Sequence, residues 1–279
     1  MIVKFALIGE KLSHTFSPFI HEEILNHIGI AGKYEVLEFA KDYLSNIIND
    51  LKYKIYRGVN VTIPYKTDII PYLDDISIEV QKIGAINTIN FMPNKVIGYN
   101  TDYFGFGKLL NYNKIDIKNK TALILGTGGA SRAVKRYLED NNIKAIKFAS
   151  TNIEYSKSKY SGYEVYNYNE LNALEKTDIA INCTPVGMYG TVNKGYVVKD
   201  FDIIDKSFLS KFDIAIDLIY NPLETIFLKE AKKLGLKTAN GLYMLVAQAV
   251  KSQEIWNDIV IDDSVIDKVN NLIENKIRN

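Results

Sequence analysis

The amino-acid sequence predicts an α/β protein with two α/β domains, the second built on a doubly wound parallel sheet. Short apolar segments of strand length alternate with segments of helix length along most of the chain, an order typical of parallel strands joined by right-handed crossovers. A glycine turn at 126–130 stands between an apolar strand and a helix, as the phosphate-binding turns of such sheets do. The length of 279 residues fits one large domain or two ordinary ones.

The first hundred residues predict one α/β unit. An apolar strand at 3–8 leads through a loop into a helix at 18–27, with Pro18 in its first turn and Ser17 as its N-cap. The pattern then predicts, in order, a strand at 34–38, a helix at 41–50, a strand at 57–63, a turn at 71–75, a helix through residue 82, and paired strands at 87–91 and 95–99. The strand at 57–63 stops before Pro64, because a proline cannot donate to a sheet ladder.

The second unit begins after residue 102 and carries the doubly wound sheet. A helix at 103–110 leads into it, and helices lie between several of its strands, one of them at 131–140. The predicted strands are 120–125, 145–149, 163–166, 179–182 and 214–218. Two helices, at 242–256 and 264–277, complete the chain, and the first has a long apolar face.

Composition argues against several classes of protein. The net charge of +1 gives no reason to expect a nucleic acid or an anionic membrane as partner. Cys183 is the only cysteine, so neither an intrachain disulfide nor a cysteine-based zinc site is expected. His21 and His27 fall on different faces of one predicted helix, and no metal site is predicted. The N-terminus looks like a strand rather than a signal peptide, and no uncharged run approaches the roughly 20 residues of a membrane span, so we expect a cytoplasmic protein.

Lys66 and Asp102 each stand just after a predicted strand, and ligands bind outside the carboxyl ends of strands in open α/β sheets. Burial there can lower the pKa of a lysine so that it exchanges a proton near neutrality. A lysine and an aspartate that end neighbouring strands can meet over a cleft, where the carboxylate would hold the ammonium in place. The alternatives are a solvated surface lysine for Lys66, and an ordinary salt bridge or a helix N-cap for Asp102.

Four further polar residues are candidates for substrate binding. The hydroxyls of Thr15 and Ser17, two residues apart in an extended loop, point the same way and could hold a polyol or a carboxylate. The alternative for Ser17 is that it only caps the following helix. Asn87 and Gln248 lie in apolar surroundings, and each is either a ligand to substrate or a satisfied core amide.

The glycine turn at 126–130 would let the backbone approach a pyrophosphate closely. The following helix adds free N–H groups and positive partial charge at its N-terminus. The match to the dinucleotide pattern is loose, and tight packing between strand and helix is the alternative. At the end of the next strand, where the adenosine ribose of a dinucleotide would lie, Ser150, Thr151 and Asn152 stand in place of an acidic residue, which leaves room for a 2′-phosphate.

Taken together, these segments resemble the shikimate dehydrogenase family almost end to end. Eight stretches match in the family's order and spacing: 9–18 with His14, 60–66, 84–88, 98–102, 126–130, 181–188, 217–222 and 240–248. The resemblance implies a substrate-binding and catalytic domain made of residues 1–102 plus 241–279, completed by the C-terminal helices. It also implies a Rossmann-type NADP-binding domain at 103–240.

The resemblance further implies reversible hydride transfer between NADP(H) and C3 of shikimate or 3-dehydroshikimate, in the chorismate and aromatic amino-acid pathway. Lys66 would transfer the proton, with Asp102 as its partner. The substrate would be bound by Thr15, Ser17, Thr62, Asn87, Tyr220 and Gln248. The cofactor would be bound by Gly126, Thr127, Gly128, Gly129, Ala130, Ser150, Thr151, Asn152, Leu218 and Gly241. The expected partner is a small-molecule substrate, and the expected oligomeric state is a monomer or a homodimer.

The chain departs from the family's pattern at three places. Thr15 and Lys11 replace the usual serine and proline of the first loop. The triplet 150–152 replaces the usual Asn-Arg-Thr, whose arginine stacks on the adenine and pairs with the 2′-phosphate. The cations that follow are Lys157 and Lys159. We expect NADP to be used, with a lysine and hydroxyls as phosphate ligands, and NAD is the alternative.

Two other functions compete with this interpretation. A quinate or quinate/shikimate dehydrogenase using NAD(P) would carry the same Lys66–Asp102 pair, and the changed cofactor loop is the feature that favours it. A non-catalytic nucleotide-binding module would be expected to lack Lys66 or Asp102, and both are present.

Overall fold

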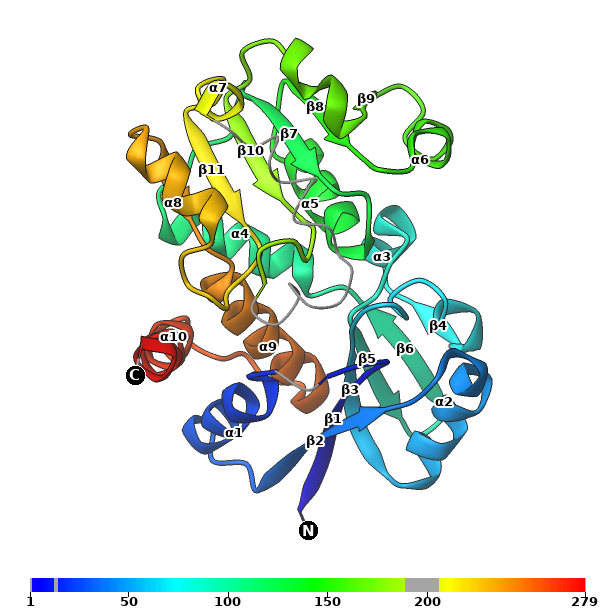
Figure 1. Cartoon of the computed structure of the whole chain (residues 1–279). Coiled ribbons are helices and arrows are strands. Elements are labelled where there is room, and N and C mark those ends of the chain that lie inside the picture. The colour runs from blue at the N-terminus through cyan, green and yellow to red at the C-terminus, as the bar shows by residue number, and fades with distance from the viewer. Residues whose placement is uncertain (1, 13–14, 189–205, 279) are drawn as a thin grey trace. The chain divides into compact units, whose positions relative to one another are not determined.

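The computed structural model describes residues 2–12, 15–188 and 206–278 (Figure 1). The chain divides into two compact units: unit 1 comprises residues 1–106 and 245–276, and unit 2 comprises 107–244 and 277–279. The sequence places these divisions near residues 102 and 241, whereas the compact units divide inside the helices α4 (Asp102–Tyr112) and α9 (Leu242–Asn257). Within the described residues, each unit contains one six-stranded sheet.

The sheet of unit 1 is mixed, with the strand order β2-β1-β3-β5-β6-β4. Its strands are β1 (Val3–Gly9), β2 (Gly32–Glu38), β3 (Tyr56–Val61), β4 (Asp75–Ile76), β5 (Thr88–Met92) and β6 (Lys95–Tyr99). Strand β5 is antiparallel to both of its neighbours, β3 and β6. Strands β3 and β6 therefore run in the same direction, and the residues that follow them lie at the same edge of the sheet.

Helices cover both faces of this sheet because its inner strand β1 is apolar on both sides. Successive side chains of a strand point to opposite faces. In β1, Ala6 and Ile8 pack with the apolar face of α2 (Leu44–Tyr53), whereas Phe5 and Leu7 pack with Trp256 of α9 on the other face. The remaining helices of this unit are α1 (Ser17–His27), α3 (Ile78–Ile83) and α10 (Ser264–Arg278), with single 3₁₀ turns η1 (Lys41–Tyr43) and η2 (Ile70–Tyr72).

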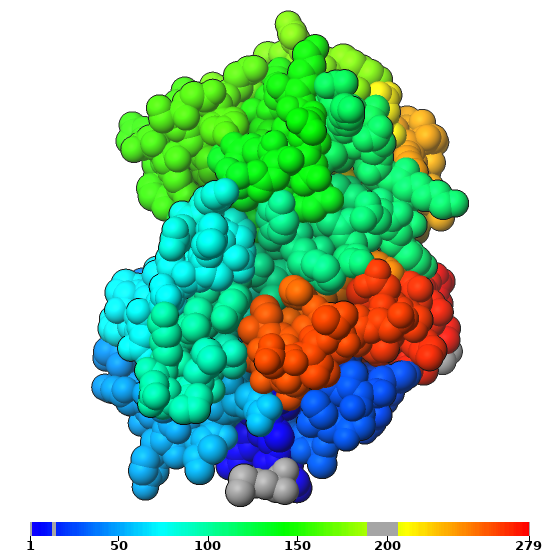
Figure 2. All heavy atoms as spheres, turned by 180° about the vertical axis from the view of Figure 1, so that it is seen from behind, coloured from blue at the N-terminus to red at the C-terminus, as the bar shows by residue number. Residues whose placement is uncertain are grey.

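The C-terminal helices belong to unit 1 although they lie far along the chain from its sheet. Lys276 of α10 lies over the ring of Phe19 of α1, 4.2 Å from its centroid. Gln253 of α9 lies 3.0 Å from Nδ1 of His21 in α1. Figure 2 shows the orange and red surface of these helices beside the blue surface of the N-terminal segment.

Unit 2 contains the predicted doubly wound sheet, with all strands parallel in the order β12-β11-β10-β7-β8-β9. Its strands are β7 (Thr121–Leu125), β8 (Ala145–Ala149), β9 (Glu164–Tyr166), β10 (Ile179–Asn182), β11 (Ile214–Asp217) and β12 (Lys237–Ala239). Its helices are α5 (Gly129–Asp140), α6 (Ile153–Lys159), α7 (Lys206–Leu209), α8 (Ile226–Lys233) and the second half of α4, with the 3₁₀ helix η3 (Tyr168–Ala173). The strand order reverses between β7 and β10, which is where ligands bind in sheets of this kind.

Some predicted elements were wrong in detail. The strand predicted at 57–63 ends at Val61, three residues before Pro64. The predicted turn at 71–75 contains Pro71 in η2 and ends in β4, where Asp75 pairs in parallel with Ile97 of β6. Strand β12 was not predicted, because its three residues carry no apolar run and it is held by pairing with β11.

Gly58 permits a close approach between the sheet of unit 1 and helix α9. The indole of Trp256 fills the space where a side chain at Gly58 would begin, so a Cβ there would overlap the ring. The indole stacks on Phe5, with ring centroids 5.0 Å apart, and its Nε1 donates to the carbonyl of Ile89 at 2.9 Å. Glycine at this position is therefore required by packing.

We expect Gly58→Ala to lower the free energy of unfolding by about 1–3 kcal/mol, because the added methyl overpacks a filled core. Urea unfolding followed by circular dichroism measures the change. Arg57→Ala, one residue earlier on the same strand and exposed, is the control and should change stability by no more than about 0.5 kcal/mol. Equal stabilities of the two variants would contradict this account of Gly58.

Candidate active site

Lys66 is held in place by its neighbours in the turn that follows β3. The preceding residue, Tyr65, is fully buried, stacks on Phe39 with ring centroids 4.9 Å apart, and donates from its hydroxyl to the Phe39 carbonyl at 2.6 Å. The carbonyl of Lys66 accepts the N–H of Ile86 at 2.8 Å. The backbone is thus fixed on both sides of Lys66, so that the aliphatic stem of its side chain leaves the edge of the sheet in a defined direction.

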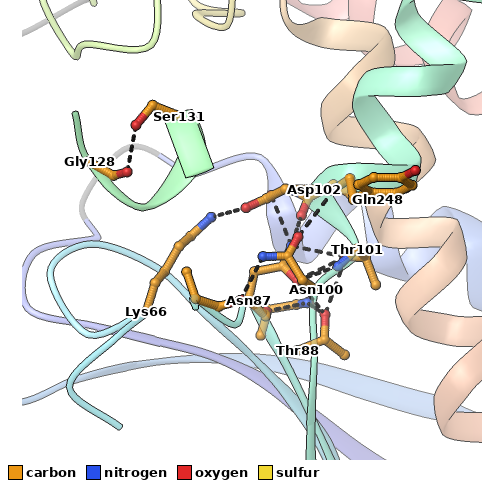
Figure 3. A network of polar contacts seen from close by, with 12 residues as sticks. Lys66, Asn87, Thr88, Asn100, Thr101, Asp102, Gly128, Ser131 and Gln248 are labelled. Atoms are coloured by element: carbon orange, nitrogen blue, oxygen red, sulfur yellow. Dashed lines mark hydrogen bonds and ion pairs between the residues drawn. The ribbon is translucent and has the colours of Figure 1, made fainter. Parts of the chain in front are cut away.

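The ammonium of Lys66 pairs with the carboxylate of Asp102, with Nζ 2.6 Å from Oδ2 (Figure 3). Only 14% of the Lys66 side chain and 6% of the Asp102 side chain are exposed, so Lys66 is not a solvated surface lysine. Asp102 is not the N-cap of the helix either, because Asn100 Oδ1 accepts the N–H of Tyr103 at 3.2 Å. The two residues follow β3 and β6, which are not neighbours as predicted: β5 lies between them.

The carboxamide of Asn87 lies behind this ion pair and is 2% exposed. Its Nδ2 lies 2.9 Å from Asp102 Oδ1, 2.9 Å from Thr101 Oγ1 and 2.6 Å from Gln248 Oε1. Its Oδ1 accepts the N–H of Thr101 at 2.7 Å. The structure therefore joins four predicted site residues, Lys66, Asp102, Asn87 and Gln248, in one network (Figure 3).

A further layer of this network was missed by sequence reasoning. Asn60 Nδ2 donates to Ser252 Oγ at 2.9 Å and to Thr88 Oγ1 at 3.0 Å, and Thr88 and Ser252 lie 2.9 Å apart through their hydroxyls. Tyr34 donates its hydroxyl to Asn60 Oδ1 at 2.8 Å. The available signal was a polar residue, Asn60, inside an otherwise apolar strand, because such a residue must find partners when it is buried.

His21 lies at the far end of this network and is neutral. Burial lowers its pKa to about 3, with the hydrogen bond to Asn60 acting in the opposite direction. Its ring stacks on Tyr34 at a centroid distance of 4.0 Å. The histidine therefore contributes packing and hydrogen bonding to the network but no charge near neutral pH.

The first loop brings the hydroxyls of Thr15 and Ser17 together, as predicted. Thr15 Oγ1 donates to Ser17 Oγ at 3.0 Å and accepts the N–H of Ser17 at 3.1 Å. Ser17 is the first residue of α1 and the N-cap is Phe16, so the predicted capping role of Ser17 was wrong. Thr62 follows β3, and its N–H donates to the carbonyl of Ile8 at 3.0 Å. His14 lies outside the described residues.

In unit 2 the glycine turn has the local geometry of an anion-binding loop. Gly126 has φ +93°, and a Cβ there would lie 2.7 Å from the Thr184 methyl. Gly128 is the N-cap of α5, and a Cβ on it would meet nothing within 4 Å. Helix α5 begins at Gly129, two residues earlier than predicted, so Gly129 and Ala130 belong to its first turn. This open backbone with the free N–H groups of a first helical turn fits a pyrophosphate.

The end of β8 presents hydroxyl groups and no charge. Ser150 Oγ accepts from Ser156 Oγ at 2.7 Å and from the N–H of Asn152 at 3.2 Å. Asn152 caps α6, accepting the N–H of Tyr155 at 3.3 Å. The side chain of Thr151 between them is exposed.

Leu218 and Gly241, predicted as cofactor residues, lie against each other. A Cβ on Gly241 would overlap the carbonyl of Leu218, and the N–H of Gly241 donates to Ile219 at 2.9 Å. The loop after β11, which also carries Tyr220, is anchored by Asp217. Its carboxylate accepts from Asn182, Ile219 and Thr225 at 2.7–3.0 Å, while burial raises the pKa of Asp217 to about 7.

Comparison with known proteins places this geometry in a family. Residues 7–89 match the model described as the shikimate dehydrogenase substrate-binding domain. A shikimate dehydrogenase (NADP(+)) from Clostridium perfringens is 44% identical over 267 residues, which cover 95% of this chain and 96% of that protein. The chain belongs to the shikimate dehydrogenase family. The membership inferred from the eight sequence stretches is thus confirmed.

Solved structures of the family share the fold of the whole chain. A chorismate mutase/shikimate 5-dehydrogenase fusion protein from Clostridium acetobutylicum is 44% identical, with a TM-score of 0.92 and 100% coverage of both chains. Shikimate 5-dehydrogenase from Thermus thermophilus, solved in complex with NADP(H) and shikimate, is 29% identical, with a TM-score of 0.80 and coverage of 97% of this chain and 99% of that one. The predicted two-domain α/β fold is confirmed. In the part of the chain that the structure describes, no helix is both long and apolar enough to span a membrane.

We expect Asn87→Ala to lower the free energy of unfolding by about 1–3 kcal/mol, because the buried N–H of Thr101 would lose its acceptor. Urea unfolding measures the loss. Asn275→Ala, an exposed asparagine of α10, is the matched control and should stay within about 0.5 kcal/mol of the parent. If Asn87→Ala were as stable as this control, the carboxamide would not hold the network together.

Proposed function

We propose that this protein is a shikimate dehydrogenase, which catalyses the reversible NADPH-dependent reduction of 3-dehydroshikimate to shikimate in the chorismate and aromatic amino-acid pathway. The observation that carries the proposal is the buried pair of Lys66 and Asp102, with Nζ and Oδ2 2.6 Å apart, in a member of this family. A buried lysine paired to a single carboxylate suits a residue that exchanges a proton with a substrate oxygen.

In this proposal the chain's own residues handle the proton and the orientation of the substrate. NADP(H), when bound, supplies the hydride chemistry. In the reduction, Lys66 Nζ gives a proton to the carbonyl oxygen at C3 and later regains one from solvent, and in the oxidation it removes the hydroxyl proton. Asp102 fixes the direction of the Lys66 side chain, and Asn87 fixes Asp102 through the contact at 2.9 Å.

The substrate's carboxylate and hydroxyls are assigned to side chains with hydroxyl or amide groups. Thr15 and Ser17 already lie together and offer hydroxyls to a carboxylate. Gln248 uses its Oε1 to accept from Asn87, which leaves the two hydrogens on its Nε2 for a substrate hydroxyl. Thr62 at the same edge of the sheet and Tyr220 of unit 2 complete the proposed set.

Unit 1 is accordingly the proposed substrate-binding and catalytic domain, and unit 2 the proposed NADP-binding domain. The cofactor's pyrophosphate is assigned to the glycine turn and the first turn of α5, with Leu218 and Gly241 beside the rest of the dinucleotide. The protein is proposed to act in the cytoplasm as a monomer or a homodimer. The matched substrate-binding model at 7–89 lies within unit 1, which supports this assignment.

We expect Lys66→Ala to lower kcat for shikimate oxidation by at least about 10²-fold, the contribution typical of a general acid–base. Steady-state kinetics with NADP measure it, with folding checked by thermal unfolding. Lys82→Ala, an exposed lysine of unit 1, should leave kcat unchanged. A Lys66→Ala variant with normal kcat and raised KM would make Lys66 a binding residue only.

The same assays with quinate as sole substrate separate shikimate dehydrogenase from the related quinate enzymes. We expect a higher kcat/KM for shikimate than for quinate. A preference for quinate would reject the proposed substrate while leaving the proton-transfer role of Lys66 intact.

A further inference from the structure

The end of β8 lacks both of the charged groups that usually decide between NAD and NADP. An acidic residue at this position accepts hydrogen bonds from the ribose 2′-hydroxyl of NAD, and an arginine pairs with the 2′-phosphate of NADP. Here Ser150, Thr151 and Asn152 provide neither. If a 2′-phosphate binds in unit 2, its charge must be met by a residue from another element.

Lys159 is placed to meet it. It is the last residue of α6, it is half-buried, and its side chain turns back to the glycine turn, where Nζ donates to the carbonyl of Thr127 at 2.9 Å. Its ammonium also lies 5.4 Å and 5.1 Å from the ring centroids of Tyr155 and Tyr160. Among the residues that the structure describes, no carboxylate pairs with Lys159.

The hydroxyl of Thr127 lies near two further hydroxyl groups. Thr127 Oγ1 lies 3.4 Å from Ser150 Oγ and 3.3 Å from Ser156 Oγ. Thr127 belongs to the turn after β7, and Ser150 directly follows β8. In dinucleotide-binding sheets the first turn meets the pyrophosphate, and a residue about 20 positions further on meets the ribose 2′-hydroxyl. The ammonium of Lys159, bonded to Thr127, is therefore next to the expected position of the ribose 2′-oxygen.

A second cation raises the local positive potential. The pKa of Lys159 is lowered to about 8, first by burial and then by the charge of Arg132 in the first turns of α5. Two like charges close together in a partly dry site repel each other, and a dianionic phosphate between them would relieve that repulsion.

We propose that Lys159 is the residue that recognises the 2′-phosphate of NADP(H), with Arg132 as a second cation and the hydroxyls of Thr127 and Ser150 as hydrogen-bond donors. The inference rests on the proposed function and specifies how its cofactor is selected. It also distinguishes Lys159 from Lys157, which lies on the same helix but is exposed.

The test is direct binding by isothermal titration calorimetry on the full chain, with adenosine 2′,5′-bisphosphate and 5′-AMP as probes. We expect Lys159→Ala to weaken binding of the bisphosphate by about tenfold or more, the effect of losing one close charge pair, and to change 5′-AMP binding less than about twofold. The matched control, Lys157→Ala, should bind both probes as the parent does. Equal losses for both probes in Lys159→Ala, or no loss, would overturn the proposal.

A second variant guards against a merely structural role for Lys159. Thr151→Arg places an arginine at an exposed position beside Ser150, and we expect it to recover bisphosphate binding when it is combined with Lys159→Ala. Thermal unfolding of each variant checks the fold. If the arginine restored no affinity to a folded double variant, the phosphate would lie elsewhere.

Binding should also depend on pH in a defined direction. The charge of Lys159 is present below its pKa of about 8 and is lost above it, while the phosphate stays dianionic above its second pKa of about 6. Bisphosphate affinity should therefore fall by up to about tenfold between pH 7 and pH 9, following the charged fraction of Lys159, and 5′-AMP affinity should not. A pH dependence that persisted in Lys159→Ala would overturn the assignment.

These measurements separate failure of this inference from failure of the proposed function. Turnover of shikimate with NADP that is indifferent to Lys159 would leave the enzyme assignment standing and reject the phosphate site. Lys159-dependent binding of the bisphosphate without any shikimate turnover would support the phosphate site and reject the enzyme assignment.

Discussion

The buried carboxamide of Asn87 is the interaction on which the geometry of the candidate site depends. It connects the start of β5 with the start of α4 and the middle of α9. Its partner at the start of α4, Thr101, is 14 residues later in the chain, and its partner in α9, Gln248, is 161 residues later. These segments can meet because β5 runs antiparallel between β3 and β6, so that the ends of β3 and β6 and the beginning of β5 lie along one edge. A buried amide without partners would cost about 1–3 kcal/mol, and the hydrogen bonds of Asn87 to these segments avoid that cost.

The network around Asn87 concentrates charge at one place. Asn60, Thr88, Thr101, Ser252 and Gln248 are neutral side chains, and the neighbouring His21 is kept neutral by burial. Lys66 and Asp102 are thus the charged members of the described network, and they face each other. Neutral hydrogen bonds can fix the orientation of Asp102 without adding a second charge that would compete for the lysine.

The sequence predicts the bounds of an element best where one local requirement, such as burial on both faces of a strand, decides its residues. Strand β7 is almost continuously apolar because it is buried on both faces, and its predicted bounds differ from the observed ones by a single residue. Short strands such as β4 depend on pairing with a distant strand, and no local pattern reveals that. Ser17 was misjudged because α1 begins one residue earlier than predicted, so that Ser17 already lies in its first turn and Phe16 takes the N-cap position.

The same distinction holds within the candidate site. Lys66 and Asp102 could be predicted because each follows a strand, and strand ends bind ligands in such sheets. The partnership of Asn60 with Ser252, 192 residues later, could not, because it exists only once α9 packs on the sheet. The need for glycine at position 58 could not be predicted either, because it arises only from contact with the indole of Trp256.

The proposed phosphate-binding charge lies on α6 rather than on the β8 loop, and this placement would change how the cofactor is recognised. An arginine offers a planar fork that fixes the phosphate by geometry and stays charged at all accessible pH values. A lysine is a compact point charge, so the hydroxyls of Thr127 and Ser150 must supply the directional bonds. Recognition then rests on an ammonium that burial and Arg132 already bring close to titration. In the proposed site, selection of NADP over NAD would therefore vary with pH, while the hydroxyls of Thr127 and Ser150 would hold the ribose of either cofactor.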